Sequence, residues 1–189
     1  YYPEVNEELI NKEIEEDPEL KTSQAKRAIA RFVELHDTNI SQRVQIIIEH
    51  FKNNVMEGLG GQAKAMVVTS SRQAAVKYAK AFDAYVKKQG YYDIRALVAF
   101  SGKVKLDGAE KEYTEVGMNK ISEDRVPSAF DSEEYNVMIV ANKYQTGFDQ
   151  NKLSAMYVLK TLRGVSAVQT LSRLNRVCPP YEKKVFVLD

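Results

Sequence analysis

Two arginines and a glutamine lie close together near the end of this 189-residue chain, at a spacing that suits phosphate chemistry. If residues 166–177 are helical, Gln169, Arg173 and Arg176 stand at i, i+4 and i+7 and project from one face. Each guanidinium presents a rigid fork of donors that matches phosphate oxygens and keeps its charge. The spacing predicts a polyphosphate contact, and the alternative is a solvated helix face.

Apolar residues on the same segment weigh against the solvated alternative. Val168, Leu171 and Leu174 would give the helix a separate apolar face to bury. The arginines would then form a second, polar face.

A short polar segment, Thr146-Gly147-Phe148-Asp149, precedes the arginines and follows a predicted strand. The glycine would let the backbone approach a ligand, the hydroxyl could bind phosphate, and the carboxylate could accept from a ribose hydroxyl. A plain β-turn is the alternative for these four residues.

Buried strands alternate with helices from residue 65 onward, and these elements must position the polar residues. Strands are predicted at 65–68, 94–100, 137–140, 156–159 and 185–188, and helices within 69–90, near 122–130 and over 166–177, with a polar loop at 101–119. The alternation predicts an α/β fold with a mostly parallel sheet flanked by helices. Ligands of such sheets meet the carboxyl ends of strands. The polar segments to consider are therefore 69–72, 101–102 and 141–150.

The first 60 residues differ from the rest. Residues 1–21 carry eight acidic and two basic side chains and are expected to form a solvated arm. Helices are predicted at 23–36 and 41–56, before glycines near residue 60 break the chain. We expect an arm with linking helices over 1–60 and an α/β domain over 61–189. The chain lacks an initiator methionine, which suggests a fragment of a longer protein.

The composition excludes several classes of protein. Cys178 is the only cysteine, so an internal disulfide and a multi-cysteine metal site are excluded. The chain has no apolar run long enough for a membrane span and no visible signal peptide, which fits a cytoplasmic protein. No cluster has metal-ligand spacing, and packing is the default role for the two histidines. The net charge of +1 means that any nucleic-acid partner must be recruited by a local patch.

A phosphate-gripping P-loop is absent. Gly102-Lys103 is the only Gly-Lys pair, but Leu97 stands where the first glycine should be and Val104 where the hydroxyl should be. An acidic magnesium-binding motif is also not recognisable.

The motifs together resemble the second RecA-like motor domain of superfamily 2 helicases and translocases. Residues 69–72 would be the fourth motif, 146–149 the fifth and 169–176 the sixth, although Ser172 stands where the family usually has glycine. The stretches VTSSRQAAVKY, ALVAFSG, IVANKYQTGFDQ and VQTLSRLNRV are similar to the motor-restriction (R) subunit of type I restriction-modification enzymes. This resemblance covers residues 63–189 strongly and the preceding helices more loosely.

The resemblance implies a role for each motif residue. Arg173 and Arg176 would reach the triphosphate of ATP, at least one as an arginine finger, and Gln169 would link the nucleotide to the domain interface. Gly147 and Asp149 would lie near the nucleotide. The expected contacts to the DNA backbone come from Thr69, Ser70, Arg72 and Thr146, with Ser101 and Lys143 as weaker candidates. Alternatively, Thr69 and Ser70 cap the following helix.

The resemblance also implies a cofactor, partners and a parent enzyme. ATP and Mg²⁺ would be bound mainly by a first RecA-like domain of the same chain. The parent would be an ATP-dependent, DNA-translocating endonuclease subunit that works on double-stranded DNA with methylation and specificity subunits, and not at a membrane. Two alternatives stay open: a motor domain of an RNA helicase or repair translocase, and a non-catalytic α/β module that binds phosphate or acidic surfaces.

Overall fold

A computed structural model of the protein describes residues 18–144 and 148–189. The chain divides into two compact units, residues 1–39 and 40–189. Most of the predicted acidic arm lies outside the described residues. The expected boundary near residue 60, between the arm with its linking helices and the α/β domain, stays a prediction.

The first unit contains helix α2 (Pro18–Leu35) and the first residues of α3 (Asp37–His50). The predicted helix at 23–36 is confirmed, but it begins earlier, at a proline that the first helical turn tolerates. His36 separates the two helices, and its Nδ1 accepts from the backbone N–H of Thr38 at 3.3 Å. The Asn39 side chain donates to the carbonyl of Val33 at 2.9 Å, which closes the turn between the helices.

The second unit is built on a five-stranded sheet whose neighbouring strands all run parallel. The strands, in spatial order, are β2 (Ala96–Ala99), β5 (Val137–Val140), β1 (Lys64–Val68), β6 (Leu153–Val158) and β7 (Phe186–Leu188). The central strand β1 is buried throughout, as a strand with neighbours on both sides requires. The predicted α/β class and mostly parallel sheet are confirmed.

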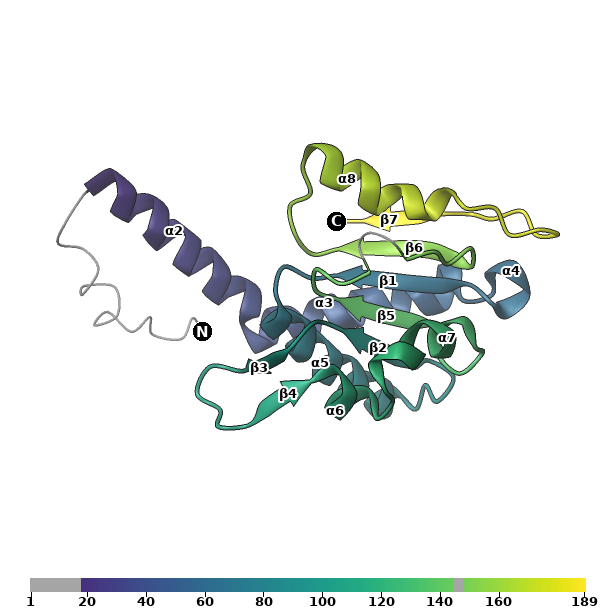
Figure 1. Cartoon of the computed structure of the whole chain (residues 1–189), viewed down its shortest axis with the longest axis horizontal. Helices are drawn as coiled ribbons and strands as arrows, with labels where there is room; N and C mark the ends of the chain where they lie inside the picture. Colours follow the sequence, from purple (N-terminus) through teal and green to yellow (C-terminus); the bar gives the residue numbers. More distant parts are fainter. Residues whose placement is uncertain (1–17, 145–147) are drawn as a thin grey trace. The chain divides into compact units, whose positions relative to one another are not determined.

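Helices cover both faces of the sheet. Figure 1 shows α3 and α5 (Arg72–Gln89) behind the strands, where α3 continues into a π-helix, η1 (Phe51–Val55). On the other face, α7 (Val126–Asp131) joins a core with alternate strand residues such as Met66 and Val68. A short turn, α4 (Gly58–Gly61), precedes β1, and the positive φ of Leu59 and Gly60 within it interrupts regular helix where the glycines predicted a break.

Helix α5 is capped at both ends by residues suited to the task. The Ser71 hydroxyl accepts from the N–H of Ala74 at 3.1 Å, and Gly90 ends the helix in the left-handed region with φ of 72°. The N-cap is therefore Ser71, so the capping role considered for Thr69 and Ser70 is wrong. These two residues precede the cap.

The segment predicted as a polar loop at 101–119 contains regular structure. A two-stranded antiparallel hairpin pairs β3 (Lys103–Lys105) with β4 (Glu112–Thr114), and a short helix, α6 (Glu115–Asn119), follows. Thr114 caps α6 by accepting from the N–H of Gly117 at 3.0 Å. A 3₁₀ turn, η2 (Glu123–Arg125), leads into α7.

The side chain of Asn119 covers the outer edge of β2. Its Oδ1 accepts from the N–H of Val98 at 2.9 Å, and its Nδ2 donates to the carbonyl of Val98 at 2.7 Å. These are the bonds that a further strand would make, so the side chain blocks pairing at this edge.

A buried lysine lies at the start of β1. Lys64 is 3% exposed, and its ammonium donates to the carbonyls of Ser132 and Tyr135 near the end of α7 and faces the ring of Phe130, 5.6 Å from its centroid. Burial lowers the pKa of Lys64 to about 8, and the positive charge of Lys152 adds to this effect. Sequence reasoning did not single out this residue.

Candidate nucleotide and DNA interface

The arginine segment is not one continuous α-helix. Helix α8 (Gly164–Leu171) gives way to a 3₁₀ turn, η3 (Ser172–Asn175), and Arg176 follows in extended backbone with φ of −70° and ψ of 128°. The Ser172 hydroxyl donates to the carbonyl of Gln169 at 3.1 Å, a local bond that competes with regular helix geometry. The prediction of a helix over 166–177 with one polar stripe is therefore wrong at its end.

Two buried side chains bring the arginines to Asp149 instead. Leu174 and Phe148 belong to the same core, and the Phe148 ring packs on Tyr144 with centroids 5.0 Å apart. Because these two buried side chains hold the residues next to them in place, Asp149 forms an ion pair with Arg176, with Nε of Arg176 3.2 Å from Oδ1 of Asp149. Both partners stay exposed, at 64% for Arg176 and 68% for Asp149.

Arg173 belongs to the same cluster. Burial lowers the pKa of its guanidinium; the charge of Asp149 raises this pKa, and that of Arg176 lowers it. The side chain keeps its charge in any case, because arginine does not lose its proton in proteins. The structure thus gathers Asp149, Arg173 and Arg176.

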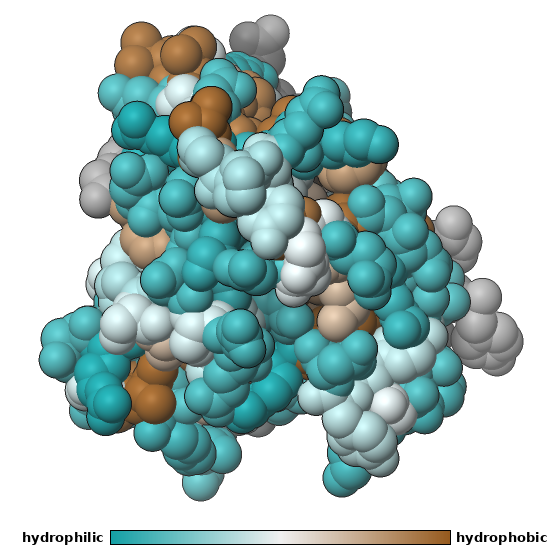
Figure 2. All heavy atoms as spheres, turned by 90° about the vertical axis from the view of Figure 1, so that its right-hand side faces the viewer, coloured by the Kyte–Doolittle hydropathy of each residue, from teal (hydrophilic) through white to brown (hydrophobic). Residues whose placement is uncertain are grey.

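Helix α8 presents side chains to solvent that the sequence suggested would be buried. Val168 is 68% exposed and Val165 71% exposed, whereas Thr170 is buried. Figure 2 shows hydrophobic atoms at the top of its view, at the height of α8 in Figure 1. The expectation that Val168 joins a buried face is wrong, since only Leu171 and Leu174 face the core. Gln169 is exposed on the same helix.

Thr146 and Gly147 lie outside the described residues. Their assignments to DNA and to the nucleotide stay predictions. The described flanks are Tyr144, which follows β5, and Phe148, which is buried in the core.

The candidate DNA residues lie at the carboxyl edge of the sheet, as predicted. Thr69 follows β1, Ser101 follows β2 and Lys143 follows β5, and these three strands are parallel neighbours. Thr69 itself is buried, and its hydroxyl donates to the carbonyls of Val140 at 2.8 Å and Ser71 at 3.2 Å. In this conformation that hydroxyl holds β1 to β5. Ser70 is partly exposed beside it.

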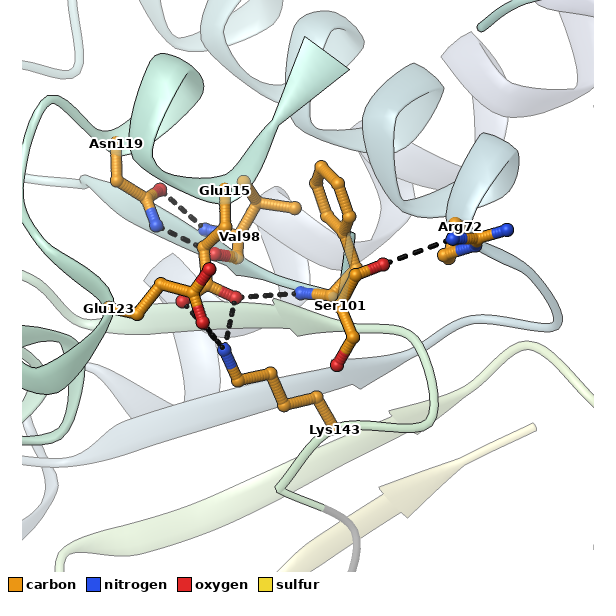
Figure 3. Close-up of polar contacts among 8 residues, drawn as sticks. Arg72, Val98, Ser101, Glu115, Asn119, Glu123 and Lys143 are labelled. Atoms are coloured by element: carbon orange, nitrogen blue, oxygen red, sulfur yellow. Dashed lines mark hydrogen bonds and ion pairs between the residues drawn. The ribbon is translucent and has the colours of Figure 1, made fainter. Parts of the chain in front are cut away.

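Arg72 and Ser101 are brought together. One terminal nitrogen of Arg72, Nη1, donates to the carbonyl of Ser101 at 3.1 Å (Figure 3) and to that of Lys103 at 3.3 Å. The intervening Gly102 has φ of 74°, and a Cβ there would lie 3.3 Å from the guanidinium. The arginine therefore holds the loop from β2 to β3 while its remaining donors stay at an exposed surface.

Lys143 is engaged by carboxylates. Its ammonium donates to both oxygens of Glu115, at 3.0 and 2.9 Å, and to Glu123 at 3.1 Å (Figure 3). Burial alone would lower the pKa of Lys143, but these two carboxylates raise it overall. Burial raises the pKa of Glu115, and Lys143 and the N–H of Phe100 offset part of that rise. This ammonium is satisfied within the protein.

Sequence reasoning missed Glu115 and Asn119 because both lie in the segment interpreted as a loop. It also passed over Lys160, which follows β6 at the same carboxyl edge and donates to Asn142 Oδ1 at 3.3 Å. Lys160 comes directly after the strand predicted at 156–159, and this position could have identified it as a candidate site residue. The described residues contain no group of three or more His, Cys, Asp or Glu arranged for a metal ion. Within the same residues, no helix is both long and apolar enough to cross a bilayer.

Comparison with known sequences identifies relatives. A family described as type I restriction enzyme subunit R, domain 3, matches residues 99–187. The putative type I restriction enzyme MjaIXP endonuclease subunit of Methanocaldococcus jannaschii is 32% identical over 179 residues, which cover 93% of this chain and 16% of that protein. The chain is related to type I restriction enzyme R subunits. The MjaVIIP endonuclease subunit of the same organism is another relative of this R-subunit-like chain, 31% identical over 137 residues, with 66% of the chain and 12% of the relative covered.

The R-subunit-like chain thus spans about one sixth or less of the length of these two relatives. Among solved structures, a similar arrangement occurs in domain 2 of the Mss116p DEAD-box helicase bound to an RNA duplex. The two share 14% identity, with a TM-score of 0.48 and coverage of 80% of this chain and 49% of that one. The Hef helicase domain of Pyrococcus furiosus is 16% identical, with a TM-score of 0.44 and coverage of 94% and 30%.

Proposed function

We propose that this chain is half of an ATP-dependent DNA motor, the second RecA-like domain of a type I restriction R subunit. In this proposal Arg173 and Arg176 reach across a cleft to ATP held by the first motor domain of the same protein. The observation that carries the proposal is the cluster of two guanidiniums and Asp149, positioned by the buried Leu174 and Phe148.

The pairing of Arg176 with Asp149 suits a residue that must change partners. An exposed ion pair contributes at most about 1 kcal/mol, so a phosphate can replace the carboxylate at little cost. A guanidinium makes bidentate, charge-assisted bonds to phosphate that are stronger than bonds between neutral groups. Asp149 would hold Arg176 near its working position while no nucleotide is in reach, and would itself lie beside the nucleotide as the motif resemblance implies.

The arginine cluster fits a triphosphate but not a metal ion. Two neighbouring guanidiniums can stabilise the charge that develops on a transferred phosphoryl group, and such arginine fingers accelerate turnover by about 10³-fold or more. ATP and Mg²⁺ would supply the phosphoryl group and neutralise its oxygens. The described residues contain no group of three or more His, Cys, Asp or Glu side chains placed to hold a metal ion. We assign the metal ligands and the P-loop to the first motor domain, and Gln169 and the exposed α8 valines to the surface that faces it.

DNA would contact the carboxyl edge of the sheet. Ser70, Arg72 and Ser101 are accessible there, and Arg72 keeps donors for phosphate while it holds the β2–β3 loop. Thr146 belongs to the same proposal. Thr69 and Lys143 contribute less directly, because their polar atoms are satisfied within the protein.

The enzyme proposed for the complete protein is an ATP-dependent restriction endonuclease. It would translocate double-stranded DNA in the cytoplasm and assemble with methylation and specificity subunits. This chain alone would be inactive, because it lacks the part of the site that binds the nucleotide. Both relatives are described as endonuclease subunits, which supports the assignment.

Phosphate release with and without DNA tests the proposal on this chain alone and on a full-length protein that contains it. The isolated chain should release none. In the full-length protein, Arg176→Ala should lower ATP turnover by roughly 10³-fold while nucleotide affinity changes little, since the first domain still binds ATP. Arg173→Ala should act similarly with more effect on affinity.

A matched control removes an arginine from another exposed ion pair. Arg95 donates to Glu134 at 2.6 Å, with 51% and 54% of the side chains exposed, and it precedes β2 at the opposite edge of the sheet. Arg95→Ala should leave turnover near the wild-type value. Substantial ATPase activity from the isolated chain, or normal translocation by an Arg173→Ala/Arg176→Ala protein, would overturn the proposal.

A further inference from the structure

A buried carboxylate stands between two loops of the candidate DNA edge. Glu115 has a fully buried side chain at the start of α6. Its Oε2 accepts from the N–H of Phe100 at 2.9 Å, and both its oxygens accept from the ammonium of Lys143. Figure 3 shows this carboxylate between the backbone at Ser101 and the side chain of Lys143. One side chain therefore joins the ends of β2 and β5.

Each end leads directly into a segment with a proposed function. Phe100 precedes Ser101, whose carbonyl is held by Arg72 at the proposed DNA surface. Lys143 precedes the segment 144–149, which contains the Thr-Gly-x-Asp motif and ends at Asp149, the partner of Arg176. The ion pair thus lies between the proposed DNA loop and the residues that lead to Asp149.

The backbone around Lys143 needs such a support. Asn142 and Tyr144 have φ of 57° and 59°, in the left-handed region that non-glycine residues rarely adopt. A side chain fixed between these two residues supports the backbone at Asn142 and Tyr144. The Lys143 ammonium also lies 5.4 Å from the centroid of the Tyr144 ring, which packs on Phe148.

Stability alone does not account for a pair in this position. Replacing both members of a buried ion pair by apolar residues of similar size is often neutral or stabilising, because the charges must be desolvated. Such a pair does fix geometry, since loss of either partner leaves a charge uncompensated. These considerations favour a role for the pair in positioning rather than in stability.

We propose that Glu115 and Lys143 are positioning residues that couple DNA contact at the β2–β3 loop to the packing of Tyr144 on Phe148 and, through the adjacent Asp149, to the arginine cluster. The inference rests on the proposed motor function. Movement of the Ser101 loop on a DNA backbone would displace the Phe100 N–H, Glu115 and Lys143 together. The pair would thereby convert DNA binding into faster ATP turnover.

The experiment compares four variants of the full-length protein: Lys143→Met, Lys143→Arg, Glu115→Gln and the Glu115→Gln/Lys143→Met double variant. The measurement is the ratio of ATP turnover with saturating DNA to turnover without DNA, with urea unfolding followed in parallel. Lys143→Met should lower the ratio by about 5-fold or more, the lower end of coupling between sites. Lys143→Arg should retain most of the ratio, because its charge still pairs with Glu115.

The double variant separates positioning from structural support. With both charges gone the stability should return toward that of the wild type, while the DNA-stimulation ratio should stay low. Glu134→Gln, in the exposed Arg95–Glu134 pair, is the matched control and should leave the ratio unchanged. A double variant with wild-type stimulation, or a Lys143→Met protein with an unchanged ratio, would overturn the inference.

A second measurement separates this inference from the proposed function. A wild-type protein whose ATPase activity does not respond to DNA would contradict the proposed motor. Backbone hydrogen exchange would then decide the coupling, because Lys143→Met should speed exchange in residues 99–103 as well as in 142–149. Faster exchange confined to 142–149 would show that the pair does not link the two loops and would overturn the inference.

Discussion

Replacing the buried Lys64 by methionine should change the pH dependence of stability. Its pKa falls from 10.5 to about 8 on folding. Above about pH 10.5 the lysine is neutral in both states and burial carries no charge penalty. As the pH falls toward 8 the unfolded chain takes up the proton first, so the folded state loses relative stability. Below pH 8 both states are protonated and the penalty is constant.

The size of the effect follows from these two pKa values. At about 1.4 kcal/mol for each tenfold ratio, the difference between 10.5 and about 8 corresponds to about 3 kcal/mol in total. Most of it develops below pH 10. Relative to Lys64→Met, the wild-type protein should gain about 2 kcal/mol of unfolding free energy between pH 8 and pH 10.

Urea unfolding at pH 8, 9 and 10, followed by circular dichroism, measures this difference. Comparison of the two proteins removes the contribution of tyrosines, such as Tyr85 with its pKa raised to about 12 mainly by burial. Lys103→Met is the control, because it removes an ammonium on a side chain that is 71% exposed and leaves Lys64 in place. A wild-type advantage that stays constant or shrinks as the pH rises would refute the reasoning.

Four further outcomes are expected. Arg176→Ala should change the free energy of unfolding by less than about 1 kcal/mol in a urea titration, because its pair with Asp149 is exposed. Leu174→Ala should cost about 2–5 kcal/mol in the same assay, since Leu174 is 2% exposed in the core. Thr146→Ala in the full-length protein should lower DNA-stimulated phosphate release more than DNA-free release. The isolated chain should bind DNA weakly, and a titration should show strong weakening by salt, because residues 160–184 carry six basic side chains against one acidic.

The central strands of the sheet could be predicted from the sequence because they are continuous apolar runs. Residues 65–68 and 137–140 correspond to β1 and β5 to within one residue. Their burial on both faces leaves little freedom for polar substitutions, so the signal is strong. The hairpin β3–β4 gave no such signal, since its strands are three residues long and mix lysine and glutamate with a single buried valine in β3.

The site could be predicted only in part, because several of its contacts join residues that are far apart in the sequence. Ser101 and Lys143 each follow a predicted strand, and the strands are expected to run parallel. Their position at the carboxyl edge of the sheet could therefore be predicted from local patterns. The partner of Lys143 lies 28 residues away in a helix that the sequence did not reveal. The 3₁₀ turn after Leu171 depends on the burial of Leu174 and on the hydrogen bond from the Ser172 hydroxyl. Neither feature changes the helical spacing of polar and apolar residues in the sequence.

The two outer strands of the sheet have unequal protection. Asn119 occupies the free edge of β2, whereas β7 ends the strand order at the other side with Val187 50% exposed and Val185 beside it at 47%. An unprotected edge with apolar side chains is a template for another chain. We therefore expect the purified chain to self-associate at high concentration along the β7 edge, and a charged side chain in place of Val187 should reduce this association.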